Sequence, residues 1–134
     1  MLNLSEKSNK NQTRIKLLII DDNEQMRRMT RFYLQDSADE IRECEDGEMS
    51  FEIFEEFLPD WVLIEVYLKK TDGFKAIRKI REAHPQAKII VVTNYTDDQT
   101  RQAAVAAGAV AFFGKDDLMD LVSWLKQMRD GFNK

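Results

Sequence analysis

Residues 60–73 read DWVLIEVYLKKTDG, and this stretch decides the fold class. Its apolar run, Trp61 to Ile64, has no polar residue at alternate positions, as a strand with one face in water would have. Uninterrupted apolar strands are typical of parallel sheets that helices cover on both faces. The run ends directly in a carboxylate, Glu65, and an Asp-Gly pair that is typical of a turn follows a few residues later. The stretch therefore predicts a buried parallel strand with an acidic group at its carboxyl end.

The rest of the chain alternates expected strands and helices around this stretch. The expected strands are residues 15–20, 40–44, 61–66, 88–93 and 109–113, and the expected helices are residues 23–35, 51–58, 71–83, 97–107 and 117–130. The core-facing side of the first helix is expected to consist of Met26, Met29, Phe32 and Tyr33. Gly108 is expected to cap the helix that precedes it. Right-handed crossovers between such elements predict an α/β, doubly wound, five-stranded parallel sheet with five helices.

Composition is typical of a single globular domain. The chain has 134 residues, 43% of them hydrophobic and 33% charged, and its formal net charge is −4. This length suits one core, and the negative charge gives no support to direct nucleic-acid binding. No apolar run approaches the roughly 20 residues of a membrane span, and the single Cys44 fits a reducing, cytoplasmic compartment. We predict a flexible lead-in over residues 1–13 and one domain over residues 14–134.

Polar groups follow four of the expected strands at the point where each apolar run stops. They are Asp21 and Asp22, Glu65, Thr93 and Lys115. In a doubly wound sheet the functional crevice lies beyond these carboxyl ends. Taken singly, each group has an ordinary explanation, such as a helix cap or a solvated lysine, but their coincidence at one edge predicts a site. Carboxylates with a hydroxyl and a lysine predict Mg²⁺ binding and phosphoryl transfer.

With these groups in place, the sequence resembles the receiver domain of two-component response regulators. Four motifs carry the resemblance: LLIIDD at 17–22, PDWVLIE at 59–65, IIVVT at 89–93 and AGAVAFFGK at 107–115. Together they cover about residues 15–130, in the family's order and spacing. The resemblance implies a flavodoxin-like sheet with the strand order 2-1-3-4-5.

The resemblance also implies a role for each polar group. Asp21 and Asp22 would bind Mg²⁺, together with the side chain at the acceptor position and the backbone carbonyl of Tyr67. Thr93 and Lys115 would bind the phosphoryl group.

The main departure from the family lies at the acceptor position, because the family has an aspartate where this chain has Glu65. Asp60 is not a substitute, since it lies at the other end of the strand. One additional methylene moves a carboxylate by about 1.5 Å, and both Mg²⁺ coordination and in-line transfer tolerate little error. We therefore expect phosphorylation of Glu65 to be impaired. Three outcomes stay open: partial imitation of the phosphorylated state, weakened Mg²⁺ binding, and an ion pair with Lys115 that replaces the metal.

Two functions from different classes follow. The first is a signalling receiver that a histidine kinase or phosphotransfer protein serves, with Thr93 and Phe112 as the switch and a downstream target protein or an output domain as its reader. The second is a pseudo-receiver that binds a partner without phosphorylation. A metal-dependent phosphatase-like enzyme is less favoured, because the chain lacks an insertion that could enclose a substrate, so we do not expect an enzyme. The family also implies a homodimer through the face formed by residues 97–130.

Overall fold

The computed structural model describes residues 15–131, so the predicted lead-in over residues 1–13 lies outside the described residues. Its strands are β1 (Lys16–Ile20), β2 (Glu40–Cys44), β3 (Trp61–Ile64), β4 (Ile89–Thr93) and β5 (Ala111–Gly114). Its helices are α2 (Glu24–Leu34), α3 (Ser50–Phe57), α4 (Gly73–Ala83), α5 (Asp98–Ala107) and α6 (Leu118–Lys126). A 3₁₀ turn (Gly47–Met49) precedes α3, and a π-helical turn (Gln127–Gly131) follows α6. None of the helices in the described part is long and apolar enough to span a membrane.

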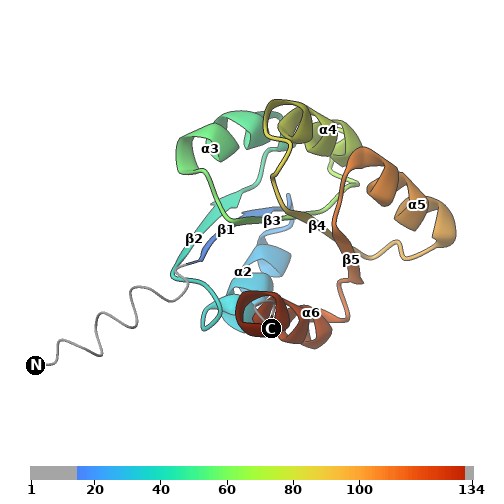
Figure 1. Ribbon diagram of the computed structural model, residues 1–134. Helices are drawn as coiled ribbons and strands as arrows, with labels where there is room; N and C mark the ends of the chain where they lie inside the picture. Colours follow the sequence, from blue (N-terminus) through green and yellow to red (C-terminus); the bar gives the residue numbers. More distant parts are fainter. Residues whose placement is uncertain (1–14, 132–134) are drawn as a thin grey trace, which may run out of the picture.

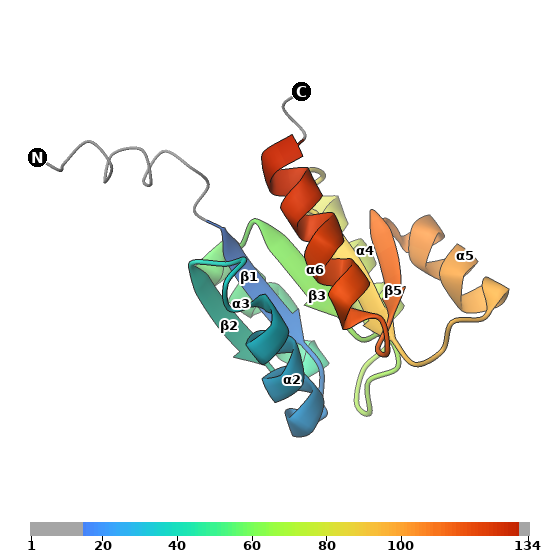
Figure 2. The same ribbon diagram turned by 90° about the horizontal axis from the view of Figure 1, so that it is seen from below.

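The five strands form one parallel sheet in the order β2-β1-β3-β4-β5, as expected. Helices α3, α4 and α5 cover one face of the sheet, and α2 and α6 cover the other (Figures 1 and 2). The predicted α/β, doubly wound, flavodoxin-like architecture is therefore confirmed.

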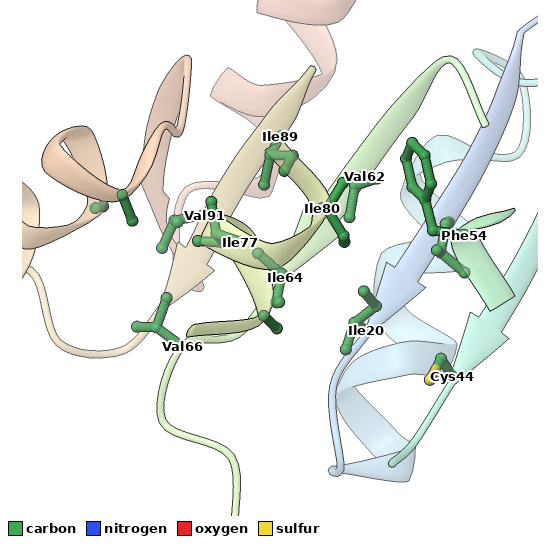
Figure 3. Packing of buried hydrophobic residues seen from close by; sticks show 14 of the residues in the cluster. Ile20, Cys44, Phe54, Val62, Ile64, Val66, Ile77, Ile80, Ile89 and Val91 are labelled. Carbon is green, nitrogen blue, oxygen red and sulfur yellow. The ribbon is translucent and has the colours of Figure 1, made fainter. Parts of the chain in front are cut away.

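Alternate residues of β3 supply two separate cores, which explains its uninterrupted apolar run. Val62 and Ile64 pack among the residues beneath α3, α4 and α5, where Ile77 and Ile80 of α4 meet them (Figure 3). Trp61 and Leu63 point to the opposite face and pack with residues of α2 and α6. All four side chains of β3 are buried as a result. Strand β2 has an alternating pattern of exposure because it lies at the sheet edge.

The expected element boundaries were correct to within about two residues except at the end of the last helix, which was expected to reach residue 130 but ends at Lys126 and continues as the π-helical turn. The differences matter at the end of β3. The strand ends at Ile64 rather than at residue 66, so Glu65 is the first residue beyond it. The Asp72-Gly73 pair is the start of α4: Asp72 is its N-cap, and the Asp72 side chain accepts a hydrogen bond from the Phe74 N–H (2.9 Å). A Cβ atom at Gly73 would lie only 2.4 Å from the Cα of Val66, so glycine permits α4 to begin against the β3 end. Gly108 caps α5 as predicted, with a φ of 117°.

The predicted core face of the first helix was largely wrong. Met29, Phe32 and Tyr33 are 47%, 67% and 38% exposed, and only Met26 of the predicted stripe packs against a core. The buried residues of α2 are Arg27, Thr30 and Leu34. Apolar periodicity indicated the solvent-facing stripe because two of the three buried residues are polar.

Candidate functional site

The carboxyl ends of β1, β3, β4 and β5 bring four of the predicted groups together. The Glu65 N–H donates to the Ile20 carbonyl (3.0 Å), which places Glu65 beside Asp21. Thr93 pairs with Gly114 in the β4–β5 register, and the Lys115 N–H donates to the Thr93 carbonyl (2.9 Å). Parallel register therefore converts four separate strand ends into one cluster.

The ammonium of Lys115 lies between two carboxylates. Its Nζ is 3.0 Å from Oδ2 of Asp21 and 2.9 Å from Oε1 of Glu65. The three side chains are 11%, 8% and 5% exposed, respectively. Buried charges of like sign repel each other strongly unless an opposite charge compensates them, and here the lysine supplies that charge.

The second carboxylate oxygen of Glu65 is also fully engaged. Its Oε2 accepts hydrogen bonds from the Thr93 hydroxyl (2.7 Å) and from the Tyr67 N–H (2.9 Å). Thr93 is completely buried. The Glu65 carboxylate is therefore held by a lysine, a hydroxyl and a backbone amide at once, an arrangement that fixes its position.

Burial and charge act in opposite directions on the ionisable groups of this cluster. Burial raises the pKa of Asp21, although the Asn23 N–H and the Lys115 ammonium act against the change. Burial alone would lower the pKa of Lys115, but hydrogen bonds and charge from Glu65 and Asp21 outweigh it and raise that pKa. Lys115 therefore stays cationic at neutral pH.

Asp22 does not join the cluster. Its Oδ2 accepts a hydrogen bond from the Lys69 N–H (2.6 Å), so it lies at the rim of the crevice. A cavity of about 200 Å³ adjoins it there, lined by Asp22, Glu45, Asp46, Gly47, Leu68, Lys69 and Lys70. The two adjacent aspartates of the sequence thus have different environments.

The donor set fits a divalent metal poorly in this arrangement. Lys115 occupies the position between Asp21 and Glu65, and Asp22 is bonded elsewhere. Across residues 15–131, no group of three or more His, Cys, Asp or Glu side chains is arranged to hold a metal ion. A metal at this edge would have to displace the ammonium, and the metal roles of Asp21, Asp22, Glu65 and the Tyr67 carbonyl stay predictions.

The side chains of the two predicted aromatic residues lie outside the ion cluster, which consists of Asp21, Glu65, Thr93 and Lys115. Phe112 is half-buried against the core beneath α5, and the Arg101 guanidinium lies 4.5 Å from the centre of its ring. Tyr67 is 48% exposed, but its hydroxyl is hydrogen-bonded to the Thr100 hydroxyl (2.9 Å). The switch role of Phe112 stays a prediction.

Sequence reasoning missed Arg27, whose buried side chain supports the site from α2. Its Nη1 donates to the Asp21 carbonyl (2.7 Å), and its Nε donates to Glu43 (3.0 Å). Arg31 also binds Glu43, at 2.6 Å. The spacing of Arg27, Thr30 and Leu34 is that of one helix face, and this was the only sequence signal that could have indicated Arg27.

The fold and the ion cluster define an α/β domain with an acid–lysine–hydroxyl site at the carboxyl edge of a parallel sheet. The family model of the response regulator receiver domain matches residues 17–126, and the chain belongs to that family. The chain is 32% identical over 111 residues to the chemotaxis protein CheY of Halobacterium salinarum, covering 80% of this chain and 92% of that protein.

Other relatives are longer than this chain. It is 32% identical over 119 residues to the transcriptional regulatory protein YhcZ of Bacillus subtilis, which covers 87% of this chain but 56% of YhcZ. Among solved structures, a CheY-like receiver domain protein from Methanospirillum hungatei shares the fold, with a TM-score of 0.79 and 22% identity over 89% of this chain and 96% of that one. The chain thus spans about half the length of some curated relatives and nearly all of others.

Proposed function

We propose that Glu65 stands at the phospho-acceptor position of this response regulator receiver domain of two-component signalling and that its carboxylate takes contacts that a phosphoryl group would make. The observation that carries the proposal is the pair of short contacts from Glu65 to Lys115 (2.9 Å) and to Thr93 (2.7 Å). The family resemblance assigns these two residues to phosphoryl binding.

Phosphorylation of Glu65 is impaired in this proposal. Both carboxylate oxygens are already engaged: one contacts the Lys115 ammonium, and the other accepts one N–H and one O–H hydrogen bond. A nucleophilic oxygen would have to break these contacts and then align with a phosphoryl donor, and misplacement by about 1 Å can lower a rate about 100-fold. The imitation is partial, because a carboxylate carries one negative charge and a phosphoryl group nearly two. The domain acts as a signalling element rather than as an enzyme.

Weak Mg²⁺ binding belongs to the same proposal. Lys115 already neutralises part of the charge of Asp21 and Glu65, so a divalent ion would compete with an ammonium held at about 3 Å from each. Mg²⁺ also demands near-octahedral oxygen ligands. Titration with Mg²⁺, followed by the fluorescence of the two tryptophans or by amide NMR shifts, measures this affinity.

The decisive experiment compares the unsubstituted chain with Glu65→Asp. Each protein is incubated with Mg²⁺ and acetyl phosphate, and its intact mass is measured. The expected result is one added phosphate on Glu65→Asp and little or none on the unsubstituted chain. Adding Asp60→Asn to Glu65→Asp is the matched control, because the Asp60 carboxylate accepts a hydrogen bond from the Lys16 N–H (2.8 Å) and its removal should not prevent modification. Stoichiometric phosphorylation of the unsubstituted chain would overturn the proposal.

A pseudo-receiver is the second candidate, and the Lys115 ion pairs favour it because a side chain of the same chain compensates the charges of Asp21 and Glu65. In that case neither protein gains phosphate and neither binds Mg²⁺. For the first candidate, the proposed partners are a histidine kinase or phosphotransfer protein and a downstream target or output domain. Homodimerisation through residues 97–130 and a cytoplasmic location stay predictions.

A further inference from the structure

A chain of hydrogen bonds leaves the Glu65 carboxylate and ends at the start of α5. The Tyr67 N–H donates to Glu65 Oε2 (2.9 Å), and the Tyr67 hydroxyl is 2.9 Å from Thr100 Oγ1. Thr100 Oγ1 in turn donates to Oδ1 of Asp97 (2.8 Å). Asp97 is the N-cap of α5, and its other oxygen accepts from the Thr100 N–H (3.1 Å).

The direction of this chain follows from its last link. The Thr100 hydroxyl has one proton and gives it to Asp97, so its oxygen accepts the proton of Tyr67. Thr100 is only 3% exposed, which shields the link from water. Hydrogen bonds from the Thr100 side chain and backbone also lower the pKa of Asp97, so that carboxylate remains an acceptor at neutral pH. Consecutive bonds of this kind strengthen one another.

A second path starts from the same carboxylate oxygen. The Thr93 hydroxyl donates to Glu65 Oε2 and accepts from the Tyr95 N–H (3.2 Å), which ties the loop before α5 to the site. The Tyr95 ring then meets the Tyr67 ring edge-on, with centroids 4.7 Å apart. Both paths therefore start at Glu65 Oε2; the second path ends at Tyr67, and the first continues from Tyr67 to Asp97.

We infer that Tyr67 is a positioning residue that transmits the position of the Glu65 carboxylate to the N-terminus of α5. The Tyr67 N–H binds the Glu65 carboxylate, and the Tyr67 hydroxyl binds Thr100, which in turn binds the N-cap residue Asp97. Phe112 is not part of this path, since its ring packs against the core and under Arg101. The inference deepens the proposed function, because it rests on Glu65 as the group whose position matters, but it requires no phosphoryl transfer.

The test is residue-resolved amide hydrogen exchange by NMR on the whole chain. The reporters are the N–H groups of Thr100 and Arg101, which bond Asp97 Oδ2 and the Asp97 carbonyl (3.0 Å for the latter). Removal of one hydrogen bond in Tyr67→Phe should raise their exchange rates about fivefold. Thr100→Val removes this bond and also the bond from Thr100 Oγ1 to Asp97, so its effect should be at least as large. Tyr95→Phe is the matched control, since among residues 15–131 its hydroxyl has no recorded hydrogen bond, and it should leave both rates unchanged.

Coupling to the site separates transmission from simple structural support. Glu65→Gln keeps the shape of the side chain and removes its charge, so it should also speed exchange at the two reporters. In the Tyr67→Phe background, the same Glu65→Gln change should add little, because the path is already broken. Additive effects, or unchanged exchange in Tyr67→Phe, would overturn the inference. Failure of the phosphorylation test above would leave this result unaffected, so the two proposals fail separately.

Discussion

Replacing Lys115 by methionine removes the only cation within residues 15–131 that contacts the carboxylate of Asp21 or Glu65. Methionine fills a similar volume, so the change mainly removes charge. Two carboxylates, 8% and 5% exposed, then face each other without compensation. We expect this variant to lose a large part of its stability at neutral pH.

The magnitude follows from the two distances. At an effective dielectric constant of about 20, charges separated by 2.9 and 3.0 Å attract each other by about 5–6 kcal/mol per pair. Most of that attraction offsets the cost of burying the charges. The loss also has an upper limit, because one of the two carboxyl groups can take up a proton once the lysine is removed. We therefore expect the free energy of unfolding to fall by about 3–4 kcal/mol, close to the range for broken buried ion pairs.

Urea denaturation followed by tryptophan fluorescence measures this change. Lys75→Met is the matched control, because Lys75 is exposed and its replacement should change stability by less than about 0.5 kcal/mol. Adding Glu65→Gln to Lys115→Met should restore part of the loss, since it removes one of the two repelling charges. A loss below about 1 kcal/mol in Lys115→Met, or no recovery in the double variant, would show that the ion cluster does not hold the site together.

Three further predictions test other parts of the molecule. Leu34→Ala should cost about 2–5 kcal/mol in urea denaturation because Leu34 is fully buried, whereas Phe32→Ala should cost little because Phe32 is 67% exposed; equal losses would contradict the orientation of α2. Burial alone would raise the pKa of Glu43, but hydrogen bonds and charge from Arg31 and Arg27 outweigh it and lower that pKa. The stability that the Glu43 charge contributes should therefore be complete above the ordinary pKa of 4.5 and disappear as the pH falls through the lowered folded-state pKa. This is checked by comparing the free energy of unfolding of Glu43→Gln with that of the unsubstituted chain from pH 3 to 7. A difference between the two free energies that grows toward low pH would refute the prediction. Gly73→Ala should lower the thermal midpoint, because the new methyl group would meet the Val66 Cα at 2.4 Å, and an unchanged midpoint would contradict that crowding.

The architecture and the central cluster were predictable because strong, local signals encode them. The apolar runs of β1, β3 and β4 supply residues to both cores, so the parallel sheet could be inferred from these runs and from the alternation of strands with helices. Asp21, Glu65, Thr93 and Lys115 converge because parallel strands end at one edge, and that geometry needs no side-chain detail.

The orientation of α2 and the contacts of individual oxygens were not predictable in the same way. Arg27 is buried because it meets Glu43 and the Asp21 carbonyl, partners that only the tertiary structure brings near. Asp22 turns to the Lys69 N–H, a backbone group 47 positions away. The Glu65–Lys115 ion pair was one of three outcomes left open. Which groups the Glu65 carboxylate contacts depends on differences in position smaller than the length of one methylene group.

The covalent attachment of the Glu65 carboxylate also determines how long its contacts can last. A phosphoryl group on a carboxylate is a mixed anhydride, which water eventually removes. The carboxylate that contacts Lys115 and Thr93 is attached through carbon–carbon bonds and cannot be hydrolysed away. In the proposed function, hydrolysis therefore cannot end these contacts, and the amount of protein that makes them is set by the rates of synthesis and degradation.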